Sequence, residues 1–108
     1  MKTLAVLAMI VSWAVALPAG AGDAQGHWDT LCAKCHGADG KGQTKMGERL
    51  GVKDFTDAKV QSDMADDAAF KAIKEGIKED GKTKMKAYTE LSDDDIKALV
   101  QHVRGFKK

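Results

Sequence analysis

The chain has 108 residues, enough for one small domain, and its 17 Lys and Arg residues nearly balance 16 Asp and Glu residues, for a formal charge of +1. Nucleic-acid-binding domains of this size usually carry a strong positive charge. We therefore expect no nucleic-acid partner.

The first residues are typical of a secretory signal peptide. Lys2 gives a short positive start, residues 4–17 form a largely apolar run, and Ala19-Gly20-Ala21 supplies the small residues of a cleavage site. The alternative is a retained membrane anchor, but a run of 14 residues falls short of the about 20 that span a bilayer. We predict a signal peptide over residues 1–21, a mature domain over residues 22–108, and no stable membrane insertion after processing.

Three main helices separated by glycine-rich loops are predicted in the mature domain, and strand signals are weak. The first helix covers residues 24–34. A short helical turn over residues 58–63 precedes the second helix, which covers residues 67–79. The third begins after Ser92 and stops at Gly105.

The third helix has the clearest pattern. Ser92 can cap it, and three acidic residues follow in the first turn, where the helix dipole favours negative charge. Its buried face is predicted at Ile96, Leu99, Val100 and Val103. The second helix is less regular, because Gly76 lies inside it and should cost about 1 kcal/mol relative to Ala. Either a neighbour packs tightly against Gly76 or this helix ends early.

The predicted apolar core is thin for a domain of this size. Five aromatic residues remain after the signal peptide, namely Trp28, Phe55, Phe70, Tyr88 and Phe106. Small domains usually need a cross-link, a metal or another staple. Five glycines within residues 37–51 would also let the backbone approach a flat ligand closely. Both features indicate that a large apolar cofactor completes the core.

The segment Cys32-Ala33-Lys34-Cys35-His36 indicates which cofactor this is. Cys-x-x-Cys-His is the attachment motif of c-type haem: the two thiols form thioethers with the haem vinyl groups, and the histidine ligates the iron. A structural zinc site would want about four ligands, and the chain has no second cysteine pair. A redox-active dithiol would want a preceding strand, whereas a helix is predicted here.

The other side of the iron needs a second ligand or stays open. The mature chain offers Met46, Met64, Met85, His27 and His102. Met85 lies in a predicted loop, 49 residues after His36, and can fold over the far face. Met46 is too close to His36 in sequence to reach around the ring, Met64 could belong to the core, and His102 is expected in solvent. We predict Met85 as the second ligand.

At this point the chain resembles the short bacterial monohaem class I cytochromes c, over essentially the whole mature region. The matching segments are 32–37, the glycine-rich loop through Met46-Gly47, 54–57, 72–76, 84–88 and 91–106. The resemblance implies an all-α, small cytochrome c fold, with three to four helices wrapped around one covalently bound haem c. It also implies His36 and Met85 as axial ligands, and places Trp28 where the first and last helices cross.

One departure from these relatives concerns the haem histidine. Many of them have a proline in the loop after the motif, and a carbonyl at that proline receives the histidine N–H. The single proline here is Pro18, in the predicted signal peptide. We expect another carbonyl within residues 37–50 to accept the bond, because such a contact fixes the ring and tunes the metal.

These features predict a soluble periplasmic carrier of single electrons and not an enzyme. Filled His/Met axial sites suit electron transfer. A positive haem edge could steer the chain, expected as a monomer, toward acidic redox partners; its lysines are Lys34, Lys41, Lys45, Lys82, Lys84 and Lys86. The alternatives are a haem sensor or minor peroxidase with a labile sixth ligand, and a haem subunit of a larger oxidoreductase.

Overall fold

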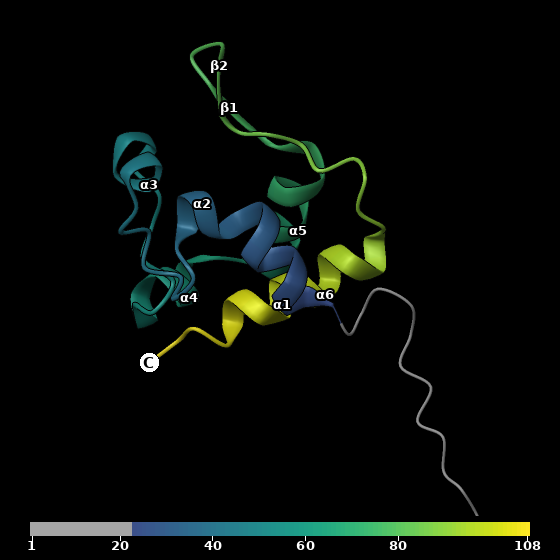
Figure 1. The fold of residues 1–108 in the computed structure, drawn as a ribbon, viewed down its shortest axis with the longest axis horizontal. Coiled ribbons are helices and arrows are strands. Elements are labelled where there is room, and N and C mark those ends of the chain that lie inside the picture. Colours follow the sequence, from purple (N-terminus) through teal and green to yellow (C-terminus); the bar gives the residue numbers. More distant parts are fainter. Residues whose placement is uncertain (1–22) are drawn as a thin grey trace, which may run out of the picture.

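The computed structural model describes residues 23–108 and shows a mostly helical domain with one short hairpin (Figure 1). The predicted signal peptide lies outside these residues. In the described part of the chain, no helix has the length and apolar character needed to cross a bilayer. The elements are α1 (Ala24–His27), η1 (Trp28–Cys32), α2 (Ala33–His36), α3 (Lys45–Leu50), α4 (Ala58–Asp63), α5 (Asp66–Glu75), β1 (Ile77–Glu79), β2 (Lys82–Met85) and α6 (Asp93–Arg104).

The first three elements form one uninterrupted helical segment. Its predicted start at Ala24 is confirmed, and it extends to His36, two residues further than predicted. The central five residues, η1, form a π-helical turn. Such turns insert an extra residue into a helix and are frequent at functional sites. Here the turn ends at Cys32, so the two cysteines lie on either side of the return to α-helix.

A helix that the sequence analysis missed, α3, lies within the glycine-rich segment. Thr44 caps it: its hydroxyl accepts a hydrogen bond from the Gly47 N–H at 2.8 Å and donates one to the Cys35 carbonyl at 2.7 Å. A Cβ atom at Gly47 would run into that same carbonyl oxygen. The glycine therefore lets α3 lie directly against α2, where the composition had predicted only a loop.

The turn α4 is confirmed, but the predicted end of the next helix is wrong. Helix α5 stops at Glu75 and not at residue 79, because Gly76 adopts φ +78° and ψ 179°, a conformation open mainly to glycine. Ile77, predicted on the apolar stripe of that helix, instead begins β1 and is 39% exposed. Strands β1 and β2 pair antiparallel, with Ile77 opposite Met85.

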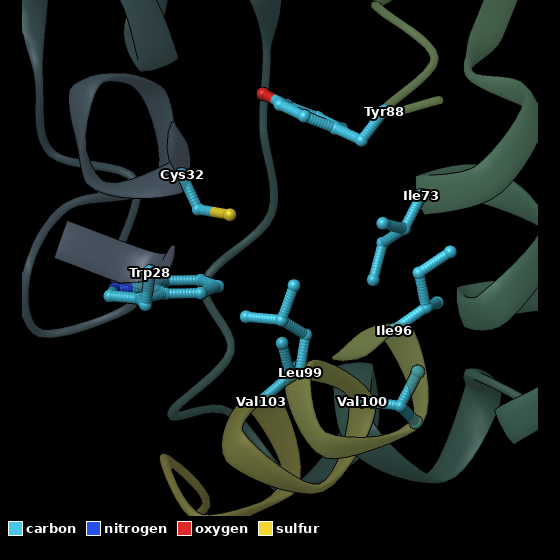
Figure 2. Packing of buried hydrophobic residues seen from close by; sticks show 8 residues of the cluster. All are labelled: Trp28, Cys32, Ile73, Tyr88, Ile96, Leu99, Val100 and Val103. Carbon is cyan, nitrogen blue, oxygen red and sulfur yellow. The ribbon is translucent and has the colours of Figure 1, made fainter. Parts of the chain in front are cut away.

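The last helix, α6, confirms its prediction closely. Ser92 and Asp95 form a capping box, with reciprocal bonds of 3.1 and 3.2 Å. The four predicted positions are all buried, and two of them, Ile96 and Leu99, have no more than 1% of their surface exposed. Helix α6 packs against both α1 and α5, so it forms the floor of the core (Figures 1 and 2).

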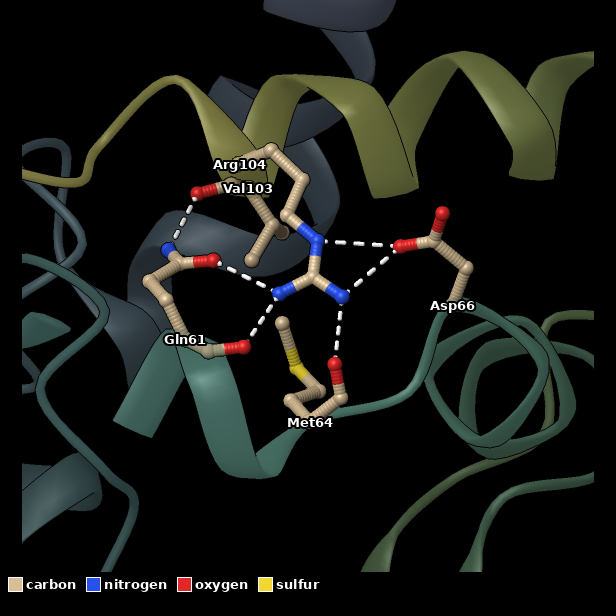
Figure 3. A network of polar contacts seen from close by, with 5 residues as sticks. All are labelled: Gln61, Met64, Asp66, Val103 and Arg104. Carbon is tan, nitrogen blue, oxygen red and sulfur yellow. Dashed lines mark hydrogen bonds and ion pairs between the residues drawn. The ribbon is translucent and has the colours of Figure 1, made fainter. Parts of the chain in front are cut away.

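A polar network fastens the end of α6 to the α4–α5 junction (Figure 3). The Arg104 guanidinium donates to the Gln61 carbonyl at 2.6 Å, to the Asp66 carboxylate at 2.9 Å and to the Met64 carbonyl. The Gln61 side chain, 4% exposed, in turn donates to the Phe55 carbonyl at 2.7 Å. The segment from Phe55 to α5 is therefore tied to α6 by side-chain contacts that helix periodicity could not reveal.

Candidate functional site

The two cysteines of the motif are not joined to each other by a disulfide. Cys32 is 7% exposed and belongs to the buried core, whereas Cys35 is half-buried. Burial, and then the neighbouring Cys35, raises the pKa of the Cys32 thiol to about 11. Redox-active dithiols are marked by the opposite shift. The structure therefore weakens the dithiol alternative.

Several side chains of the buried core belong to one cluster with Cys32. Figure 2 shows the Cys32 sulfur, the Trp28 ring and the Leu99, Ile73 and Tyr88 side chains directed at a common interior. An apolar interior edged by a free thiol is chemically suited to a flat apolar group bonded through sulfur. The residues present thus fit a covalently attached haem.

Tyr88 closes this interior from the hairpin side. Its ring is 8% exposed, and its hydroxyl donates to the Leu31 carbonyl at 2.9 Å, which joins the segment after β2 to the π-turn. Burial raises the pKa of this phenol to about 12. Tyr88 is therefore a neutral hydrogen-bond donor that ties two sides of the site together.

His36 stands beside the interior, between two aromatic rings. Its ring stacks on Phe55, with centroids 5.1 Å apart and planes inclined by 25°, and its centroid lies 5.7 Å from that of Trp28. Burial lowers the pKa of His36, which keeps the imidazole neutral at pH 7. A neutral imidazole is the form that ligates a metal.

The predicted carbonyl acceptor for the His36 N–H is not found. The Nδ1 atom is buried and has no hydrogen-bond partner within residues 23–108. The adjacent carbonyls are used elsewhere: that of Cys35 accepts from Thr44, that of His36 from the Gly42 N–H, and that of Gly37 from the Trp28 indole at 3.0 Å. These three carbonyls nearest the motif therefore accept hydrogen bonds from other donors and not from His36 Nδ1.

The methionines fall into two groups. Met85, at the end of β2, and Met64, just after α4, are half-buried and pack against the core cluster that contains Cys32. Met46 instead lines a hollow of about 370 Å³ on α3, together with Lys34, Lys45 and Arg49. The structure thus keeps Met85 and Met64 at the core and directs Met46 elsewhere.

The expectation that His102 lies in solvent is wrong. Its ring is half-buried, with its centroid 5.4 Å from Trp28 and 5.1 Å from Phe106, and its Nε2 atom is buried without a hydrogen-bond partner in the described residues. It packs where α6 crosses the N-terminal helix, as the resemblance placed Trp28. His27 lies on α1, with Nε2 3.7 Å from the Asp23 carboxylate.

Sequence reasoning missed two residues of the site. Phe55 contacts His36 from a turn 19 positions later, and Arg49 joins the lysines around the α3 hollow. The pattern Asp54-Phe55-Thr56 held a local signal, because an Asp carboxylate commonly bonds the backbone two residues on. That signal predicts the turn but not the contact between Phe55 and His36.

Across residues 23–108, no three His, Cys, Asp or Glu side chains gather as a metal site, so the zinc alternative has no ligand set there.

Comparisons with known proteins agree with this architecture. Residues 19–103 match the family described as cytochrome c oxidase, cbb3-type, subunit III. The structure of the KustC0563 c-type cytochrome is similar at 39% identity and a TM-score of 0.71, over 80% of this chain and 99% of that one. A Tyr-to-Phe point mutant of Kustc0563 is similar at 38% identity and a TM-score of 0.68, over 79% and 99%. No curated protein gave a significant match.

Proposed function

The chain belongs to the small class I c-type cytochromes and carries one covalently attached haem c with its iron, and from that premise we propose that it is a soluble periplasmic carrier of single electrons. Cys32 and Cys35 hold the haem, and His36 and Met85 ligate the iron. The observation that carries the proposal is the placement of the motif, with the Cys32 sulfur directed into the apolar interior (Figure 2).

The protein residues supply insulation and ligand geometry. When bound, haem c accepts and releases one electron at iron. Trp28 and Leu99, both nearly inaccessible, exclude water from the interior, and Tyr88 holds the hairpin side closed. The neutral His36 ring offers a lone pair to the metal. With two protein ligands in place no ligand is exchanged, which suits outer-sphere transfer and disfavours oxygen chemistry.

Met85 is the residue that we propose would hold the iron together with His36. It ends β2 at the core, on a hairpin whose base is fixed where Gly76 passes against the Met85 backbone. Met64 also reaches the core, but its carbonyl is anchored by Arg104 in the network of Figure 3. A thioether ligand raises the reduction potential relative to other haem ligations.

The absorption spectrum of the oxidised protein tests this assignment. Met85→Ala should lose the methionine-to-iron charge-transfer band in the far red, while Met64→Ala, the matched control, keeps it. A band that survives in Met85→Ala and disappears in Met64→Ala would reverse the assignment. Ready binding of carbon monoxide by the reduced wild type at neutral pH would instead favour a sensor or peroxidase with a labile sixth ligand.

The proposed docking face is the lysine-rich haem edge, through which the monomer meets acidic redox proteins. Lys34 and Lys45 gather with Arg49 around the α3 hollow, and none of the three forms an ion pair within residues 23–108. Arg49 adds a planar fork that matches a carboxylate. The remaining lysines of the face are Lys41, Lys82, Lys84 and Lys86, of which Lys86 lies 3.9 Å from Glu90.

Ionic strength separates this docking face from unrelated surface charge. Electron exchange with an acidic partner should slow as salt rises, since screening weakens steering. Replacing Lys34, Lys45 and Arg49 with Gln should weaken that dependence, whereas Lys59→Gln on α4, which pairs with Asp63, should leave it unchanged. Rates that ignore salt in the wild type would contradict the proposal.

A second candidate function follows from the description of the matched family, which names an oxidase subunit. The chain could serve as a haem subunit of a larger oxidoreductase. Reversible voltammetry of the isolated protein would support the free carrier, and co-purification with a membrane oxidase would support the subunit. Mass spectrometry of the exported protein tests the predicted signal peptide. It should give a chain that starts at Gly22 and bears one haem, and an uncleaved chain would overturn both processing and periplasmic release.

A further inference from the structure

The orientation of the His36 ring has an unusual basis in this structure. A metal-bound histidine is ordinarily held by a hydrogen bond from its other ring nitrogen to a carbonyl, carboxylate or water. The Nδ1 atom of His36 is buried without such a partner among the described residues, and the nearby turn carbonyls already accept other donors. Among the described residues, the contacts of the ring that bear on its orientation are therefore those with its aromatic neighbours, Phe55 and Trp28.

Phe55 provides a rigid surface against that ring. The two rings are close to parallel, at 25°, with centroids 5.1 Å apart. Trp28 meets the Phe55 ring edge-on, with centroids 6.4 Å apart and planes at 60°, and also borders His36. Rotation of the imidazole about its Cβ–Cγ bond would therefore give up the stacked contact with Phe55.

The backbone at Phe55 is itself held from several sides. Its N–H donates to the Gly40 carbonyl at 2.8 Å, and its carbonyl accepts from the Gln61 side chain at 2.7 Å. The preceding Asp54 carboxylate accepts from the Thr56 N–H at 2.8 Å and from the Thr56 hydroxyl at 2.6 Å. Because these contacts come from different segments, the position of the Phe55 ring is set by the fold and not by a single turn.

We propose that Phe55 is a positioning residue that fixes the plane of the His36 imidazole by stacking, in place of a hydrogen bond from Nδ1. This inference rests on the proposed function, since it takes His36 as the iron ligand. It assigns to Phe55 a role beyond filling the core. The ring plane should then depend on an aromatic face at position 55 and not merely on apolar bulk there.

Three variants of the haem-loaded protein test the idea. Phe55→Leu keeps apolar bulk but removes the flat face, Phe55→Tyr restores the face, and Phe70→Leu is the matched control on α5, where Phe70 contacts the core but not His36. The readouts are the hyperfine-shifted haem-methyl resonances of the ferric protein, which depend on axial-ligand orientation, and the reduction potential.

We expect Phe55→Leu to reorder the haem-methyl resonances and shift the potential, while Phe55→Tyr and Phe70→Leu keep the wild-type pattern. Identical patterns in Phe55→Leu and Phe70→Leu would overturn the positioning role. If Phe55→Leu does not fold, the wild type still decides: nuclear Overhauser contacts between the Phe55 and His36 rings should appear in the ferrous protein, and their absence refutes the stacking.

Failure of the proposed function would look different. It would appear in the wild type itself, as a ferric spectrum without the signature of histidine and methionine ligation, whatever the variants show. A wild type with that signature and an unresponsive Phe55→Leu removes the positioning inference alone.

Discussion

The segment that carries the attachment motif and the hairpin that carries Met85 are held to the core in different ways. The motif lies on a continuous helical segment with Trp28 and Cys32 buried, and it is bonded on its outer side to Thr44 and Gly42. In the hairpin, residues 77–83 are all exposed, and Lys84 and Met85 are half-buried. A two-stranded hairpin is only marginally stable by itself.

The difference means that the His36 side and the side of Met85, the proposed second ligand, depend on different kinds of contact. The His36 side is held by packing and by backbone hydrogen bonds in addition to any ligand bond. The Met85 side depends on a few anchors at the base of the hairpin, chiefly Gly76 and the Tyr88 N–H, which donates to the Ile73 carbonyl at 3.0 Å. We therefore expect damage to the first side to unfold the domain, and damage to the second to detach Met85 while the domain stays folded.

The largest effect is expected for Trp28→Ala. The indole is 2% exposed, meets the Phe106, His102 and Phe55 rings, and bonds the Gly37 carbonyl. Truncating a buried aromatic of this kind costs about 3–5 kcal/mol of unfolding free energy. Denaturant unfolding of the haem-loaded protein measures it, and Trp28→Phe, which loses mainly the hydrogen bond, should retain most of the stability. A loss of unfolding free energy below about 1 kcal/mol for Trp28→Ala would contradict the expectation that damage to the motif side unfolds the domain.

A smaller and more local effect is expected for Gly76→Ala. Its backbone lies in a glycine-only region, where another residue costs about 1–3 kcal/mol. The added Cβ would also lie 2.6 Å from the Met85 carbonyl oxygen and 2.8 Å from the Ala87 nitrogen. The variant should stay folded, as judged by helical circular dichroism, but lose much of its methionine charge-transfer band.

Gly81→Ala is the control for that experiment. Gly81 also has a positive φ, +74°, at the tip of the hairpin, but a Cβ there meets no atom within 4 Å. Backbone strain without the contact should leave the band in place. Equal loss of the band in both variants would mean that the hairpin as a whole, and not its base, holds Met85.

The same contrast explains what the sequence could predict. The capping residues and the apolar spacing of helix α6 are both features of its own local sequence. Its buried face was therefore predictable, at Ile96, Leu99, Val100 and Val103. The motif was predictable because its spacing is dictated by covalent chemistry. The identity of the second iron ligand, by contrast, stays a prediction. The sequence narrows the choice to a few methionines and histidines, among which we predict Met85.

The parts that sequence reasoning missed depend on contacts between distant segments. Helix α3 was hidden because Gly47 looked like a loop residue until the carbonyl of Cys35 was placed beside it. The hairpin was hidden because its two strands are short, mostly polar and exposed, and share no apolar face, so only pairing of Ile77 with Met85 reveals it. The stack of Phe55 on His36 joins the end of α2 to a turn 19 residues later, and helix periodicity does not predict contacts over that separation.

The smallest effect concerns the half-buried turn at residues 54–56 on the motif side. Hydrogen bonds from the Thr56 hydroxyl and then from the Thr56 N–H lower the pKa of Asp54 below its usual 3.8. A carboxylate whose pKa is lowered in the fold stabilises it above the unfolded pKa, and this contribution is lost as the pH falls through the folded pKa. Because the carboxylate keeps contact with solvent, the gain in stability is small.

Thr56→Val isolates this contribution, since it removes the hydroxyl donor and keeps the N–H. The pKa of Asp54, followed by carboxyl carbon NMR, should rise toward its usual value, and the variant should lose a little stability at neutral pH and none in strong acid. An unchanged Asp54 pKa would mean that the turn before Phe55 is not ordered in solution. The motif side would then be held as weakly as the hairpin, and the stacking of Phe55 on His36 would lose one of the contacts that hold Phe55 in place.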